Sequence, residues 1–189
     1  MRQVAFLCLL LLAGCARTPA PVETGRLAPE AQAAIDRLLD AMRQRLVIMH
    51  DVARWKWNAK ASIHDPAREQ TILDSIVARS KLDPGFTRAF FTAQFAAARQ
   101  VQEDDFRRWE GAKQAAFADA PDLTGRLRPR IDTLSDELLG TLAAIMPLLD
   151  DPAAQRHLQQ RAPVVLRGDG ITDTIRETAV APLLAPRRE

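Results

Sequence analysis

Two cationic residues, Arg45 and Lys56, lie at positions where an amphipathic helix normally presents apolar side chains. They belong to a stripe of residues spaced alternately four and three apart: Leu38, Met42, Arg45, Met49, Val52 and Lys56. This spacing is typical of the buried face of a helix, and burying a cation is costly unless an anion compensates its charge. The stripe therefore predicts either ion pairs inside a helical bundle or a site that binds an anion.

The separation of the two cations suits a small molecule. At about 1.5 Å per residue, the step from Arg45 to Lys56 places them about 16 Å apart on one face of a helix, so their long side chains can lean toward each other. More polar residues follow along the chain: Asp65, Arg68, Glu69, Gln94 and Gln102. A site built from them would have many donors, few acceptors and no evident nucleophile.

The three histidines do not indicate a metal site. His50, His64 and His157 have no carboxylate or cysteine partner at the spacing of metal ligands. We therefore expect no metal. Trp55, Trp57 and Trp109 are expected to pack in or beside the core.

The elements that position these residues are all predicted to be helices, because apolar residues recur with helical spacing and never alternate over a useful length. We expect an all-α, single-domain bundle of about six helices, at residues 29–61, 66–80, 84–118, 131–147, 152–162 and 169–181. Two Asp-Pro pairs, at 65–66 and 83–84, mark helix starts, because Asp caps a helix and Pro suits its first position. Pro and Gly residues indicate a loop at 119–129.

Composition narrows the class of protein. The chain has 189 residues, of which 47% are hydrophobic, with 8 Gly and no Tyr, and this favours one helical domain with a sizeable core. The formal charge is +2, from 26 basic and 24 acidic residues that are mixed along the chain. No basic stripe or RNA-binding aromatic motif occurs, so we expect no nucleic-acid binding.

The N-terminus is predicted to be a targeting segment. Arg2 precedes a short apolar run at residues 4–13, and Leu-Ala-Gly-Cys at 12–15 is similar to a bacterial lipobox. The expected organisation is a signal peptide at 1–14, a lipidated Cys15, a tether at 15–28 and a folded domain at 29–189. Ordinary secretory cleavage nearby is the alternative. The protein is expected to be exported under either interpretation. If Cys15 is lipidated, the lipid would be its one contact with the membrane. The domain would contain no thiol and hence no internal disulfide.

An ordered set of motifs resembles those of a known family. The set runs from about residue 35 to 132 and comprises Arg45, Lys56 in "WKW", "IHDPARE" at 63–69, "LDPGF" at 82–86, "FFTAQ" at 90–94, Gln102 and "LRPRID" at 127–132. It is similar to the secreted, all-helical chorismate mutases of the AroQ gamma subclass. The resemblance implies a chorismate mutase type II-like fold, no cofactor, a homodimer and a periplasmic location. It also implies the conversion of chorismate to prephenate, a pericyclic Claisen rearrangement without covalent intermediate or proton transfer.

The resemblance further implies roles for individual residues in binding the chorismate dianion. Arg45 and Arg128 would each grip one carboxylate. Lys56 and Gln102 would donate to the ether oxygen that breaks, and Arg68 would orient Lys56 or the ether region. The alternatives are a solvated lysine for Lys56 and an ordinary loop arginine for Arg128.

Three further positions complete the expected site. Asp65 is predicted to cap a helix, and in the family this turn also helps to bind the ring hydroxyl, largely through backbone. Glu69 would accept that hydroxyl, the alternative being a solvated pair with Arg68. Ala98 stands where the family often has Ser or Thr, so one hydroxyl contact is missing. Gln94 is expected to be a structural amide between helices.

The first interpretation is therefore an exported chorismate mutase, an isomerase with its active site inside one protomer. One alternative is a non-catalytic helical lipoprotein that binds a small dicarboxylate or a protein partner, toward which only Ala98 points. Another is a structural envelope bundle. The two cations of the stripe argue against the structural bundle, because Leu would fill those positions at lower cost.

Overall fold

The computed structural model describes residues 25–186, and every regular element in that range is helical, which confirms the predicted all-α class. The α-helices are α1 (Pro29–Val47), α2 (Met49–Ala59), α3 (Pro66–Arg79), α4 (Pro84–Ala112), α5 (Arg128–Ile145), α6 (Pro152–Val165) and α7 (Asp173–Leu184). Two short turns accompany them: a π-helical turn, η1 (Leu123–Leu127), and a 3₁₀ turn, η2 (Met146–Leu148). The predicted signal peptide, Cys15 and most of the tether lie outside the described residues.

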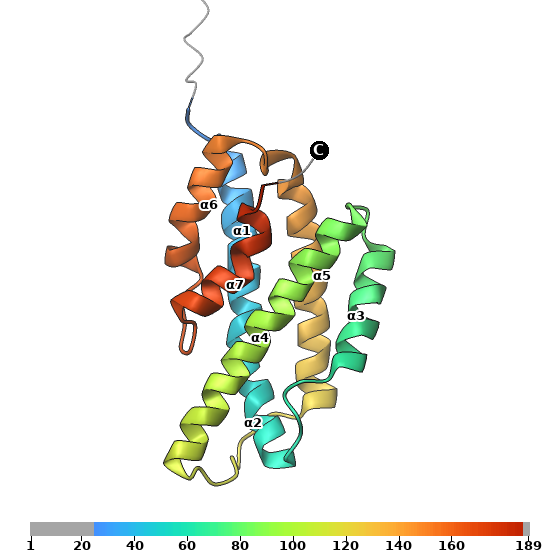
Figure 1. Cartoon of the computed structure of the whole chain (residues 1–189), viewed down its shortest axis with the longest axis vertical. Helices are drawn as coiled ribbons and strands as arrows, with labels where there is room; N and C mark the ends of the chain where they lie inside the picture. Colours follow the sequence, from blue (N-terminus) through green and yellow to red (C-terminus); the bar gives the residue numbers. More distant parts are fainter. Residues whose placement is uncertain (1–24, 187–189) are drawn as a thin grey trace, which may run out of the picture.

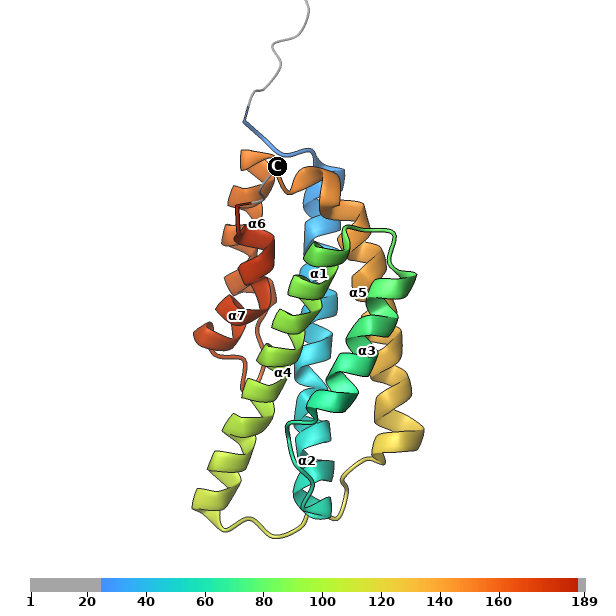
Figure 2. The same ribbon diagram turned by 45° about the vertical axis from the view of Figure 1, so that its right-hand side comes forward.

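The helices form an elongated bundle around α1 and α2. These two follow each other along the long axis of the molecule, and α4 crosses in front of them (Figure 1). Helices α6 and α7 flank one side of α4, and α3 and α5 flank the other, as the rotated view also shows (Figure 2). Helix α4 packs against α7, α2 and α3, while α1 packs against α5 and α6. Segments distant in sequence therefore meet along both central helices.

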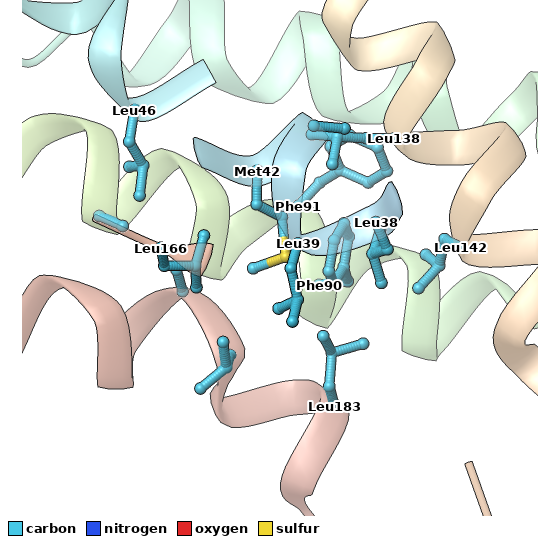
Figure 3. Packing of buried hydrophobic residues seen from close by; sticks show 14 of the residues in the cluster. Leu38, Leu39, Met42, Leu46, Phe90, Phe91, Leu138, Leu142, Leu166 and Leu183 are labelled. Atoms are coloured by element: carbon cyan, nitrogen blue, oxygen red, sulfur yellow. The ribbon is translucent and has the colours of Figure 1, made fainter. Parts of the chain in front are cut away.

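The core lies where α1, α4, α5 and α7 converge (Figure 3). Its fully buried side chains include Leu38, Leu39 and Met42 of α1 with Phe90 and Phe91 of α4. Fully burying a side chain of this size stabilises a fold by about 2 kcal/mol. The stripe prediction is correct for its apolar members, which are buried in both α1 and α2. The core contains no cysteine among the described residues, so apolar packing holds the domain together.

The predicted helix starts at the two Asp-Pro pairs are confirmed. Asp65 Oδ1 accepts the backbone N–H of Arg68 at 3.1 Å, and Asp83 Oδ1 accepts that of Phe86 at 2.7 Å. In both cases the proline follows at the first helical position, where its missing N–H costs nothing. Local sequence alone therefore decides where α3 and α4 begin.

The predicted end of α4 at residue 118 is wrong, because the helix stops at Ala112. Lys113 adopts a left-handed conformation with φ of 51°, and the N–H of Gln114 reaches back to the Trp109 carbonyl at 2.9 Å. Lys60 caps α2 in the same way, so α2 ends at Ala59, two residues before the predicted boundary. A left-handed cap is usually glycine, so a lysine there gives no sequence signal.

The first predicted helix is also divided. Ile48 separates α1 from α2, although its backbone stays in the right-handed helical region and no proline or glycine is present. The seven α-helices among the described residues, against the six expected, result from this division.

Two other helix boundaries differ from the prediction because prolines lie within the helices and do not end them. Helix α5 starts at Arg128 rather than at residue 131, because Pro129 fits within its first turn. Helix α6 continues past Pro163 to Val165, and the hydrogen-bond pattern resumes with the N–H of Leu166 donating to the Ala162 carbonyl at 2.9 Å. Helix α7 begins later than predicted, at Asp173, and runs to Leu184.

Candidate active site

A cavity of about 360 Å³ lies between α1, α2, α3, α4 and the start of α5. All seven side chains predicted to bind or transform a substrate line it: Arg45, Lys56, Asp65, Arg68, Glu69, Gln102 and Arg128. They come from five different helices or helix starts, which the bundle brings together. Ala98 also lines the cavity, and Gln94 does not.

Arg45 is the most deeply buried cation of the cavity, with 5% of its surface exposed. Its Nη1 donates to the Gln94 carbonyl oxygen at 3.2 Å, and its guanidinium carbon lies 5.2 Å from the centre of the Phe95 ring. Its Nε has no hydrogen-bond partner within the described part of the chain. Burial lowers the pKa of Arg45 to about 10, against an opposing effect of the Glu69 charge. The fold thus retains a poorly compensated positive charge at this point.

Lys56 is half-buried, whereas its position in the stripe suggested full burial. The difference arises because its side chain lines the cavity. Its Nζ donates to the Ile63 carbonyl oxygen at 2.7 Å and so ties α2 to the segment before α3. Burial holds the pKa of Lys56 below its ordinary value, and the charges of Glu69 and Asp65 partly offset this effect. The ammonium has a neutral oxygen as its partner, so most of its charge is available to a ligand.

The first turn of α3 presents three polar residues to the cavity. The Asp65 carboxylate caps the helix, as predicted, and both Asp65 and Arg68 are exposed at the cavity rim. Glu69 is partly buried, and it does not form the solvated ion pair with Arg68 that was the alternative prediction. Its partner is Arg99 of α4, whose Nη1 lies 2.5 Å from Glu69 Oε2.

Arg99 is a cavity residue that the sequence analysis missed. A signal was present, because Phe95, Arg99 and Gln102 are spaced four and three apart, as in the stripe of the first helix. Asp132, in the first turns of α5, is a further lining residue that was not singled out.

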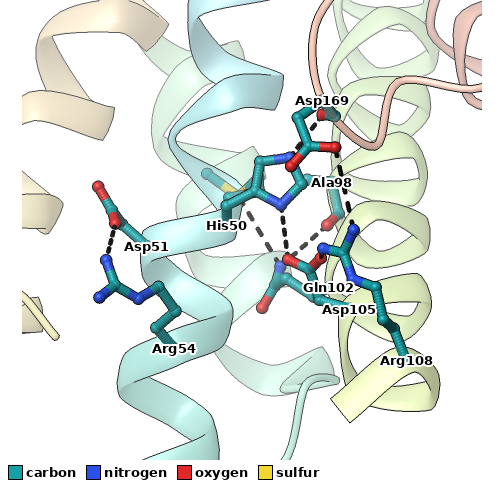
Figure 4. A network of polar contacts seen from close by, with 9 residues as sticks. His50, Asp51, Arg54, Ala98, Gln102, Asp105, Arg108 and Asp169 are labelled. Carbon is teal, nitrogen blue, oxygen red and sulfur yellow. Dashed lines mark hydrogen bonds and ion pairs between the residues drawn. The ribbon is translucent and has the colours of Figure 1, made fainter. Parts of the chain in front are cut away.

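Gln102 is buried with 4% exposure, and its amide is directed at its own helix (Figure 4). Its Nε2 donates to the Ala98 carbonyl at 3.0 Å and lies 3.7 Å from Met49 Sδ, whereas Oε1 has no partner among the described residues. Sulfur is a weak acceptor, so a ligand oxygen can replace that contact at little cost. Gln94 is structural, as expected, since it donates to the Ala179 carbonyl of α7 at 2.8 Å.

Arg128 reaches the cavity because the preceding connection is fixed to α2. Asn58 exchanges two hydrogen bonds with the backbone of Phe117, at 2.7 and 2.8 Å. Arg54 contacts Asp119 and stacks on the Phe117 ring. Arg128 then begins α5 as a half-buried residue, although a loop was predicted at 119–129.

His50 lies on the neighbouring face of α2 and belongs to a separate polar network (Figure 4). Its Nδ1 is 2.6 Å from Asp105 Oδ2, and its Nε2 is 2.6 Å from the Asp169 carbonyl oxygen. The hydrogen bond to Asp105 is the main cause of the raised pKa of His50. Gly170 is required here, since its φ is +68° and a Cβ would lie 2.5 Å from the imidazole ring. Within residues 25–186 no group of three or more potential ligands is arranged to hold a metal ion.

The side chains that line the cavity suit non-covalent chemistry. Five are cationic and three are carboxylates, an excess of two positive charges. Among the described residues that line it there is no histidine or cysteine, and the hydroxyl of Ser62 donates to the His64 carbonyl at 2.9 Å and not to a base. Such a site can bind a dianion and stabilise developing negative charge.

Comparison with known proteins agrees with this chemistry. The family of type II chorismate mutases matches residues 32–103. The secreted chorismate mutase of Mycolicibacterium smegmatis is 31% identical over 142 residues, which cover 74% of this chain and 78% of the relative. The chain belongs to the chorismate mutase family. It is accordingly an isomerase, and the non-catalytic alternatives are not favoured.

Other chorismate mutases are similar over most of the chain. The secreted chorismate mutase of Mycobacterium tuberculosis is 29% identical over 133 residues, 69% of this chain and 66% of that one. The crystal structure of the chorismate mutase from Burkholderia thailandensis superimposes with a TM-score of 0.70 at 30% identity, covering 80% of this chain and 99% of that one. The resemblance proposed from the motifs is therefore confirmed. The segment that matches the type II family, residues 32–103, ends before Arg128, which the fold brings to the cavity.

Proposed function

We propose that the cavity is the active site of an exported chorismate mutase and that its side chains bind chorismate and stabilise its rearrangement. The observation that carries this proposal is the excess of two positive charges in a cavity without an activated nucleophile. Chorismate has two carboxylates, so its charge complements that excess. The direct test is the loss of chorismate absorbance on adding the purified domain, beginning at about residue 28.

The proposed mechanism needs no proton transfer. A carbon–oxygen ether bond breaks as a carbon–carbon bond forms, so the protein must hold the compact conformer and stabilise negative charge on the ether oxygen. Arg45 and Arg128 hold the two carboxylates. Lys56 directs its ammonium to the ether oxygen, exchanging its bond to the Ile63 carbonyl for this one.

The first turn of α3 completes the proposed site. Asp65 contributes by fixing the turn, since its carboxylate is already engaged as a cap, and the backbone of this turn contacts the ring hydroxyl. Glu69 accepts that hydroxyl. Arg68, at the exposed rim, orients Lys56 or the ether region. Gln102 donates the N–H that now faces Met49 Sδ to the ether oxygen.

The role of Gln102 predicts a particular pH dependence. An amide donates without being protonated, so kcat should be nearly constant from about pH 5 to 8. Above that range it should fall as Lys56 loses its proton, earlier than a free lysine would, because burial lowers its pKa. Gln102→Glu should work best at acidic pH and lose activity as the new carboxyl ionises.

The measurement is kcat against pH for both proteins on the same substrate. Gln160→Glu is a suitable control, because this exposed amide of α6 is not among the cavity residues. An acid-biased profile in the wild type, or a Gln102→Glu variant indifferent to pH, would show that Gln102 does not face the ether oxygen.

Export is supported by the relatives that are named secreted chorismate mutases, and by the apolar N-terminal run. We propose in addition that residues 1–14 are removed and that Cys15 carries a lipid. No helix within residues 25–186 has the length and apolar character required to cross a membrane. The tether at 15–28 would then connect the lipid to the domain at 29–189, in the periplasm.

Lipidation predicts a separable anchor. Cys15→Ser should abolish acyl labelling and membrane fractionation, whereas a chain beginning at about residue 28 should remain soluble and active. Thiol reagents should not affect that shorter chain, because both cysteines precede it. Mature protein isolated from membranes with an unmodified Cys15 would exclude the lipobox interpretation. The homodimer implied by the family resemblance stays a prediction, and sedimentation of the same chain would test it.

A further inference from the structure

Arg99 and Glu69 form an ion pair across the wall of the cavity. Arg99 belongs to α4 and Glu69 to the first turn of α3, and their side chains are 25% and 27% exposed. Arg99 Nη1 lies 2.5 Å from Glu69 Oε2. His64 Nε2 is 3.9 Å from the same oxygen. Both of these contacts are at Oε2, and Oε1 accepts no hydrogen bond within the described residues, so it is available to a ligand.

Glu69 needs to be restrained because it lies among cations. Its negative charge partly offsets the lowering of the pKa of Arg45 and of Lys56 by burial, so it acts on both cations. A glutamate has three rotatable side-chain bonds and is attracted to the nearest available positive charge. Without a partner on α4, Glu69 could turn onto the Lys56 ammonium and neutralise a charge needed for the ether oxygen.

We propose that Arg99 is a positioning residue of this active site. By binding Oε2, it holds the Glu69 carboxylate at the junction of α3 and α4, directs Oε1 to the substrate hydroxyl and keeps the Lys56 ammonium free. The inference rests on the proposed function, in which Glu69 contacts the substrate. Arg99 acts through Glu69 and makes no contact of its own with the substrate.

The same two helices provide a matched control. Arg88 of α4 pairs with Asp74 of α3 at 2.8 Å, and both side chains are more exposed, at 44% and 54%. Neither lines the cavity. If an ion pair between α3 and α4 mattered only for stability, removing Arg88 and removing Arg99 would have similar consequences.

The test is a double-mutant cycle on kcat/KM for chorismate, measured with the whole chain. Arg99→Met keeps most of the apolar stem and removes the charge. It should lower kcat/KM roughly tenfold, within the range found for coupling between contacting residues. In a Glu69→Ala background the same substitution should have almost no effect. Arg99→Lys should recover part of the loss, and Arg88→Met should retain wild-type kcat/KM.

Three results would overturn the proposal. Equal losses from Arg99→Met with and without Glu69 would mean that Arg99 contacts the substrate directly. Unchanged kcat/KM in Arg99→Met would mean that Glu69 needs no partner. A loss that follows the melting temperature, and that Arg88→Met reproduces, would indicate a purely structural pair. Lys56→Ala tests the proposed active site separately from the proposed role of Arg99. If that variant keeps its activity, the active-site assignment fails, and the inference about Arg99 fails with it.

Discussion

Replacing Lys56 with alanine should lower kcat/KM for chorismate at least ~100-fold, the scale observed when one preorganised donor is removed. The ammonium is half-buried, and its hydrogen-bond partner is the neutral carbonyl of Ile63, so its charge is available for the ether oxygen. The ether oxygen gains negative charge only as its bond breaks, so the ammonium stabilises the transition state more than the bound substrate. The loss should therefore appear in kcat as well as in kcat/KM.

The fold should survive this substitution, because one hydrogen bond to the segment before α3 is lost and no buried carboxylate is left unpaired. Lys56→Met, which keeps the apolar stem, separates the charge from the packing. Lys81→Ala, an exposed lysine outside the cavity, is the control and should match the wild type in stopped chorismate assays. Near-normal turnover in both Lys56 variants would refute the assignment.

Arg45→Met should have a comparably large effect on activity and should not lower the stability of the fold. A bidentate guanidinium–carboxylate contact combines two charge-assisted hydrogen bonds, so its loss should lower kcat/KM about 100-fold or more. Much of this should be a rise in KM, since the carboxylate is held equally before and during the reaction. Methionine is similar in length and carries no charge to desolvate, so the melting temperature should stay the same or rise.

Arg43→Met provides the comparison, because Arg43 lies on the same helix, pairs with Asp40 and does not line the cavity. It should leave kcat/KM unchanged. Thermal unfolding and steady-state kinetics of both variants are the required measurements. If Arg45→Met were strongly destabilised and still active, Arg45 would be a structural cation and not a carboxylate ligand.

Much of the fold was predictable from local sequence. Asp65 and Asp83, each followed by proline, identify the starts of α3 and α4, because a cap involves only residues within one turn. The errors concern features that local sequence does not encode. Lys113 ends α4 in a left-handed conformation that lysine seldom adopts, and Pro163 is tolerated within α6. Both side chains are exposed, so no apolar pattern marks either position, and backbone hydrogen bonds from Gln114 to Trp109 and from Leu166 to Ala162 close these helix ends.

The candidate site shows the same division. The sequence alone determined the helical class, the spacing that places Arg45 and Lys56 toward one face, and the motifs shared with the chorismate mutases, because helical periodicity and sequence motifs are properties of contiguous residues. Only the tertiary structure decided that Arg99 faces Glu69 and that Arg128 begins α5 beside the cavity. These relations join segments 30 or more residues apart, and the packing of α4 and α5 onto the central helices sets them.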